Sequence, residues 1–227
     1  MDHIFDMEKI MSFFNYVYYF FILNLLFLLS NIPLIGFYFL VGISSIGEFL
    51  PMFLLCLLPL APSLCAMFHC MYKLVKNKDL YPIREYYKGY KSNFNQSVVI
   101  GAVQLLAIFI ICMSIRIFSS IPQIAFFTII LSIELALIVL MTPFLYLFIS
   151  RYTMKSLAIL KVSFVTVIGK PLYALGNAIV FLFVLMLFEI TAGTTFLFIG
   201  SVYAFLLVLT NRKLFRKLES WKLSFLR

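Results

Sequence analysis

The sequence predicts an all-α protein, a polytopic transmembrane helical bundle of about six spans that is one membrane domain over residues 1–227. Its composition is the first reason, because 64% of the 227 residues are hydrophobic and only 12% are charged. The mean hydropathy is +1.08. A water-soluble domain of this length needs more polar surface than this chain provides. The second reason is that the basic residues gather in a few stretches between long apolar runs.

The basic stretches predict the orientation of the chain. The longest, residues 73–97, carries six basic residues against Asp79 and Glu85. Two more follow, a second loop at 151–170 and a tail at 211–227. Because basic residues favour the cytoplasmic side of a membrane, we expect all three segments, and both termini, to lie in the cytoplasm. This arrangement, together with Lys9, places 17 of the 18 Lys and Arg residues inside.

Six apolar stretches are long enough to be the spans. We expect them at about residues 13–41, 51–72, 94–118 and 123–149, with two more between 171 and 210. Pro33 predicts a kink in the first span near Ser30, where side chains can bond the carbonyls that proline frees. Pro59 and Pro62 predict a break in the second span, either at a substrate site or in a proline kink packed on the first span.

A short helix is predicted inside the first basic stretch. Pro82 suits its first position, and Ile83, Tyr86, Tyr87 and Tyr90 recur at helical spacing. We expect this helix to lie along the membrane, either as an interfacial anchor or as a docking face for a partner. Basic residues in and beyond it are predicted to contact lipid headgroups, namely Lys88, Lys91, Arg151, Lys155, Arg212, Lys213, Arg216 and Lys217.

One acid falls at membrane depth. Glu134 lies in the fourth span, about 18 Å from its expected outer end at 1.5 Å per residue. A bare carboxylate there is costly, so we expect a neutral Glu134 that is hydrogen-bonded to Gln104 of the third span or to a backbone carbonyl. Such a pair is either a structural pin between helices or a proton or ligand site.

The motifs of enzymes and cofactor sites are missing from the sequence. It contains no phosphate-binding P-loop, nucleophile elbow, zinc-protease motif or dinucleotide fingerprint. The four cysteines form no C-x-x-C pair, and His69 has no second ligand at metal-site spacing. We therefore expect no catalytic residues, no metal and no cofactor. The net charge of +9 is assigned to lipid headgroups and not to nucleic acid.

Several segments together resemble the YesL family of bacterial membrane proteins, also called domain of unknown function 624. They are NLLFLLSNIPLIG from Asn24 to Gly36, the turn from Pro59 to Pro62, IREYYKGYKSNFNQS, TPFLYLFISRY, and the later KVSF and KPL. The chain departs from the family pattern in an extra apolar stretch from Phe37 to Leu58, which forms either a full span or a re-entrant hairpin.

The resemblance implies a place in the bacterial cell membrane and a role beside carbohydrate uptake. The expected function is a non-enzymatic subunit accessory to an ABC sugar importer, with membrane lipids and the permease subunits as partners. Two alternatives stay open. One is a self-contained six-span protein that binds or transports a substrate, and the other is a structural or regulatory membrane protein.

Overall fold

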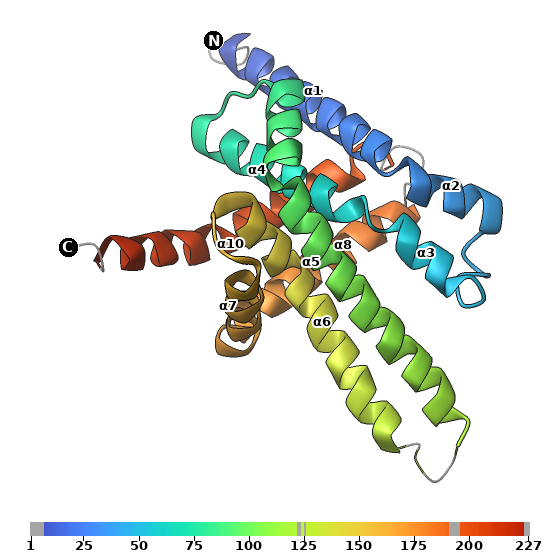
Figure 1. Cartoon of the computed structure of the whole chain (residues 1–227). Helices are drawn as coiled ribbons and strands as arrows, with labels where there is room; N and C mark the ends of the chain where they lie inside the picture. The colour runs from blue at the N-terminus through green and yellow to red at the C-terminus, as the bar shows by residue number, and fades with distance from the viewer. Residues whose placement is uncertain (1–6, 122–123, 125, 191–195, 225–227) are drawn as a thin grey trace.

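The computed structural model describes residues 7–121, 124, 126–190 and 196–224. These residues form helices and no strand (Figure 1), which confirms the predicted all-α bundle. The helices are α1 (Met7–Ser30), α2 (Ile32–Val41), α3 (Leu50–Cys56), α4 (Leu60–Asn77), α5 (Pro82–Ser119), α6 (Phe126–Arg151), α7 (Ser156–Gly169), α8 (Pro171–Ile190) and α10 (Ile199–Ser224).

Five helical segments of the described chain are long and apolar enough to cross a membrane. They are Phe13–Ser30, Leu50–Asn77, Pro82–Ser119, Phe126–Arg151 and Pro171–Ile190. The sixth expected span corresponds to α10, which is not among the five because its apolar part ends near Thr210 and the basic tail continues the same helix. The apolar α7 occupies most of the second basic segment. The turn between the last two spans is expected at residues 189–195, and most of that range lies outside the described residues.

The first predicted span is two helices, because the chain breaks at Asn31 between α1 and α2. Side chains replace the backbone bonds that the break removes. Asn31 Nδ2 donates to the carbonyl of Phe27 at 2.7 Å, and Ser30 Oγ donates to that of Leu26 at 2.8 Å. The kink predicted from Pro33 is therefore confirmed, and the polar residues beside it have the capping role that a membrane interior demands.

The second predicted span is also broken, between Cys56 at the end of α3 and Leu60 at the start of α4. The two breaks touch, because Asn31 Nδ2 donates to Ser63 Oγ at 2.9 Å and both side chains are buried. This contact favours the packed kink over a substrate site at the break. The stretch from Phe37 to Leu58 holds the second half of α2, a turn region and α3, and Figure 1 shows α3 returning toward the bundle beside α2.

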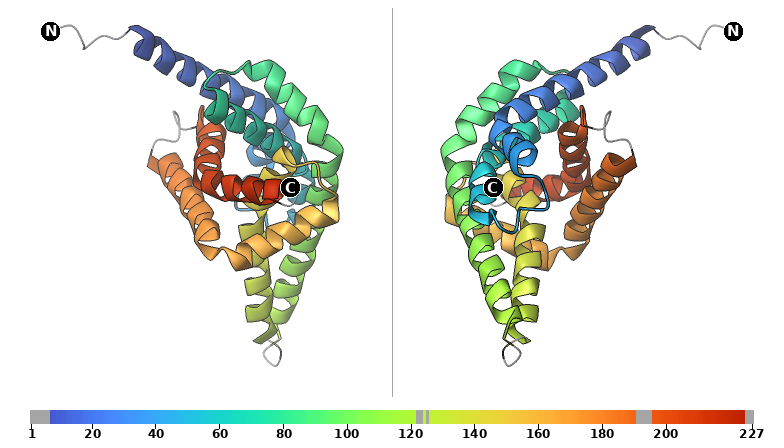
Figure 2. Two further views of the ribbon diagram at one scale, coloured as in Figure 1. Left: turned by 90° about the vertical axis from the view of Figure 1, so that its left-hand side faces the viewer. Right: turned by 90° about the vertical axis from the view of Figure 1, so that its right-hand side faces the viewer.

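Helix α4 is the centre of the bundle. It packs against α1, α5, α6 and α10, and its middle residues Cys65, Ala66 and Met67 are completely buried. Figure 2 shows α5 curving along one side of this core while α8 and α10 close the other. Small side chains let the helices approach closely, as in many membrane bundles.

Helix α5 differs from the prediction. The surface helix expected from Pro82 and the third span expected from Phe94 form one continuous helix of 38 residues. At 1.5 Å per residue its length is about 57 Å, well beyond a hydrocarbon core of about 30 Å. The first basic stretch is therefore mostly helical, and only residues 78–81 link α4 to α5. The missed continuity has a simple cause, since nothing between Tyr90 and Ser97 breaks a helix.

The C-terminal part of α5 and the N-terminal part of α6 extend beyond the other helices as a two-helix arm (Figures 1 and 2). We call this part, residues 103–119 of α5 and 126–139 of α6, the α5–α6 arm. Arg116 on the arm donates from Nη1 to the carbonyl of Gly47 at 2.8 Å. That bond brings the turn before α3 to the same end of the molecule as the tip of the arm, as the predicted topology requires.

Candidate functional site

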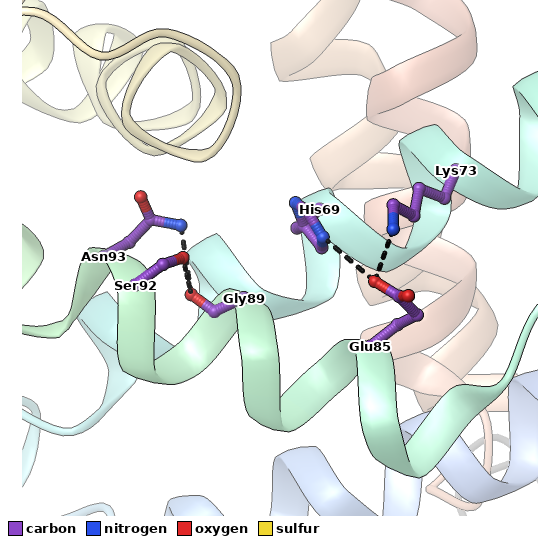
Figure 3. A network of polar contacts seen from close by, with 6 residues as sticks. All are labelled: His69, Lys73, Glu85, Gly89, Ser92 and Asn93. Carbon is purple, nitrogen blue, oxygen red and sulfur yellow. Dashed lines mark hydrogen bonds and ion pairs between the residues drawn. The ribbon is translucent and has the colours of Figure 1, made fainter.

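A polar network joins α4 to the start of α5 at the basic end of the bundle (Figure 3). His69 and Lys73 are one turn apart on α4, so their side chains point to the same side. Both reach Glu85 in the first turn of α5, with Lys73 Nζ 2.6 Å and His69 Nε2 3.4 Å from Glu85 Oε2. The Glu85 side chain is mostly buried, and this network connects the first turn of α5 to α4.

Gly89 lies one turn after Glu85 on α5 (Figure 3). A Cβ at this position would stand 3.1 Å from His69 Cβ and 3.2 Å from Ala66 Cα. The Gly89 carbonyl accepts hydrogen bonds from Asn93 Nδ2 at 3.0 Å and Ser92 Oγ at 3.3 Å, as Figure 3 shows. The close approach of α4 and α5 therefore depends on the missing side chain of Gly89.

The predicted docking face is divided between the interior and the surface. Tyr86 is only 4% exposed, its hydroxyl lies 3.0 Å from Ser30 Oγ, and its ring stacks on Tyr90. Ile83 and Tyr87 are exposed, at 61% and 66%. The four residues therefore do not form one face that a partner can cover. The docking role stays a prediction for Ile83 and Tyr87, whereas Tyr86 belongs to the core.

The predicted pair of Gln104 and Glu134 does not form. Gln104 Nε2 donates to Thr142 Oγ1 at 2.5 Å, and the Tyr146 hydroxyl donates to Gln104 Oε1 at 3.1 Å. Gln104 lies about 22 Å from the end of α5 at the tip of the arm, and Glu134 lies about 12 Å from the end of α6 there, so the two side chains lie at different levels along the helices. Glu134 is exposed on the arm instead.

Three of the eight basic residues predicted to contact headgroups come together. Arg151, Arg212 and Arg216 line a cavity of about 270 Å³ with Tyr72, Val75, Lys76 and Val208. The others lie apart from it. Lys88 and Lys91 are exposed on α5, Lys155 is exposed just before α7, Lys213 is exposed on α10, and the Lys217 side chain lies outside the described residues. Lys76 also lines the cavity but was not predicted as a headgroup contact, although its position one turn after Tyr72 places both side chains on one side of α4.

Arg151 is held between aromatic rings in this basic cavity. Its Cζ lies 4.0 Å from the centre of the Tyr72 ring and 4.4 Å from that of Phe215. Arg151 Nη2 also donates to the Tyr72 hydroxyl at 3.0 Å. Such contacts fix the plane of a guanidinium group, so Arg151 presents its donors in a defined direction.

A larger cavity lies elsewhere in the bundle and is almost wholly apolar. It has a volume of about 520 Å³ and is lined by residues of α1, α4, α6, α8 and α10, with Thr142, Asn177 and Tyr203 as its polar members. Asn177 is buried and accepts a hydrogen bond from Asn211 Nδ2 at 2.7 Å. Within the described residues, no group of three or more His, Cys, Asp or Glu side chains is placed to hold a metal ion.

The comparison with known families matches the part of the chain that contains the polar network and both helix breaks. The model described as a protein of unknown function, DUF624, matches residues 20–115. This range is a DUF624 segment. The resemblance to the YesL family is thereby confirmed, because YesL and DUF624 name the same family. The matched range runs from α1 to the arm portion of α5 and includes His69, Lys73 and Glu85. No curated protein and no solved structure matches the chain.

Proposed function

We propose that the protein is a non-enzymatic membrane subunit accessory to a bacterial carbohydrate ABC importer, with the importer's permease subunits as its partners. It resides in the cell membrane as a multi-pass protein, with both termini and the basic segments in the cytoplasm. The carbohydrate assignment rests on the family resemblance alone. The role as a subunit has a physical support of its own in the α5–α6 arm.

The observation that carries the subunit role is an exposed acid on an apolar arm. Glu134 is exposed, and its neighbours Ile130 and Ile133 on α6 are 48% and 58% exposed. An acid in a membrane span normally faces protein or water, because the hydrocarbon core solvates it poorly. A partner helix that offers a hydrogen-bond donor at the depth of Glu134 removes this cost. The arm is therefore the surface that we assign to the permease.

The cavities favour an accessory role over direct sugar binding. A sugar needs many hydrogen-bonding groups, whereas the lining of the 520 Å³ cavity is mostly aliphatic and aromatic. The basic cavity carries donors only from cationic side chains and the Tyr72 hydroxyl, which suits an anion better than a neutral sugar. The larger cavity has only Thr142, Asn177 and Tyr203 as polar lining residues, and in the basic cavity the Tyr72 hydroxyl is the one side-chain acceptor among the described lining residues. Neither therefore offers the many mixed donors and acceptors of a sugar site.

Affinity purification from the native membrane tests this proposal. The tagged protein is extracted in a mild detergent, and its companions are quantified by mass spectrometry against an equally tagged, unrelated multi-pass protein. We expect the permease and ATPase subunits of one carbohydrate importer to be enriched, and uptake of its labelled sugar to fall in a strain lacking this protein. Normal uptake in that strain, with no importer subunit enriched, would contradict the proposal.

A further inference from the structure

The basic cavity between α4, α6 and α10 brings four cationic side chains together, which favours the binding of an anion. Lys76, Arg151, Arg212 and Arg216 all line one space of about 270 Å³. Arg212 and Arg216 are one turn apart on α10 and exposed, so their guanidinium groups extend from the same side of the helix. Like charges at this spacing repel each other. An anion bound between them is attracted to both and offsets this repulsion.

The acids of the described chain do not neutralise the two arginines of α10. Glu85 is engaged by Lys73 and His69 on another side of α4. Asp79 accepts hydrogen bonds from the Tyr19 hydroxyl and from the Leu80 amide, both at 2.8 Å. Among the described residues, no carboxylate lies within ion-pair distance of Arg212 or Arg216. Their charge is therefore available to a ligand.

The geometry of the donors fits a phosphate group. Arginine presents a planar fork of donors that matches two oxygens of a phosphate, and three arginines line this cavity. Arg151 is already oriented by the rings of Tyr72 and Phe215. A fixed guanidinium loses little conformational entropy on binding, which strengthens such a site.

The position of the cavity along α10 indicates which molecule supplies the phosphate. Val208 belongs to the apolar part of α10, whereas Arg212 and Arg216 belong to its basic part. The cavity therefore lies where the apolar and basic parts of the bundle meet, which is the level of lipid headgroups. We propose that it binds the phosphate of an anionic phospholipid from the leaflet on the basic side. This inference does not depend on the importer assignment.

Native mass spectrometry of the delipidated protein provides the test. The probes are phosphatidylglycerol and phosphatidylcholine with identical acyl chains, and inorganic phosphate serves as a competitor. We expect one phosphatidylglycerol to bind far more tightly than phosphatidylcholine and to resist millimolar inorganic phosphate. Equal binding of the two lipids would overturn the proposal. Displacement of phosphatidylglycerol by inorganic phosphate would show that the cavity binds free phosphate and not a lipid headgroup.

Charge-matched variants test the location. Each basic residue near a charged headgroup changes affinity by about fivefold, so the double variant Arg212→Gln/Arg216→Gln should bind phosphatidylglycerol about 25-fold more weakly. The control Arg84→Gln/Lys161→Gln also removes two exposed charges, but from α5 and α7 and outside the lining of the cavity, and should stay within about twofold of the unaltered protein. All these side chains are exposed, so folding is expected to be retained and is checked by size exclusion. Equal losses in the two variants would contradict a specific site.

Discussion

Two glycines of α5 set the distance between the two central helices. A Cβ at Gly101 would stand 2.8 Å from Ala61 Cβ, and a Cβ at Gly89 would press on His69 and Ala66. Both contacts are tighter than ordinary packing, so the backbones of α4 and α5 approach each other only because these side chains are missing. Close backbone approach is a main source of helix association in membranes, where the hydrophobic effect contributes little.

The smallest substitution tests this packing. Gly101→Ala should lower the free energy of unfolding by about 1 to 3 kcal/mol, because a methyl group must displace α4. Gly36→Ala is the matched control, since nothing lies within 4 Å of a Cβ there. Unfolding in mixed detergent micelles measures both variants. Adding Ala61→Gly to Gly101→Ala should restore much of the loss, and a double variant no more stable than Gly101→Ala alone would count against the close contact.

Two neighbouring tyrosines should respond very differently to truncation. Tyr86→Ala removes a buried ring and should cost about 3 to 5 kcal/mol of stability, the scale for large aromatic truncations in a core. Tyr87→Ala, at an exposed position, should leave stability within about 0.5 kcal/mol. Thermal unfolding in detergent separates the two variants. Similar melting temperatures for both would contradict the burial of Tyr86.

At the scale of elements, the two helix breaks form one unit. α1 and α2 part at Asn31, α3 and α4 part just before Leu60, and the Asn31–Ser63 hydrogen bond connects the breaks. Polar side chains at such breaks satisfy backbone groups that lipid cannot. The buried Asn24 has a similar function toward α10, because it accepts from the Gly200 amide at 2.9 Å and donates to the Phe196 carbonyl at 3.0 Å.

A double-mutant cycle measures the bond between the breaks. Asn31→Val and Ser63→Ala each remove one partner, and the coupling between them should be about 0.6 kcal/mol, the average for hydrogen bonds between membrane helices. Gln104→Leu combined with Ser63→Ala is the control cycle, because Gln104 bonds to Thr142 and Tyr146 instead. A coupling near zero for Asn31 and Ser63 would show that the two breaks are held by packing alone.

The elements were predictable wherever the signal is local. Apolar length predicted the spans, and the prolines at 33, 59 and 62 predicted both breaks. Contacts between elements were not predictable from spacing. The pairing of Gln104 with Thr142, and not with Glu134, depends on the relative depth of two antiparallel helices. The burial of Tyr86 depends on Ser30, 56 positions earlier in the chain. The basic cavity combines residues of α4, α6 and α10, so no single stretch of sequence indicates it.

At the scale of the whole molecule, the charges divide the bundle into two ends. Arg116 lies with Gly47 at one end. The polar network and the basic cavity lie toward the opposite ends of α5 and α6. This asymmetry predicts that the basic end faces the cytoplasm. The α5–α6 arm projects beyond the bundle at the end away from the basic residues. The apolar sides of the arm are therefore left to contact lipid or a partner.

Cysteine labelling tests the orientation. In a variant whose four native cysteines are replaced by alanine, Gly47→Cys should react with a membrane-impermeant thiol reagent applied from outside, and Tyr87→Cys should react only after permeabilisation. Both positions are exposed, so a lack of reaction reflects the membrane and not burial. Labelling of Tyr87→Cys in intact cells would reverse the proposed topology.

Site-specific photocrosslinking in native membranes tests the central claim, that the arm binds a permease. A photoreactive amino acid is placed at Ile133, which is 58% exposed beside Glu134, and as a control at Leu172, which is 81% exposed on α8. We expect an adduct with the importer's permease subunit from position 133 and not from position 172, and loss of that adduct when Glu134→Leu is added. Lipid adducts alone at position 133, or a permease adduct from position 172 only, would contradict it.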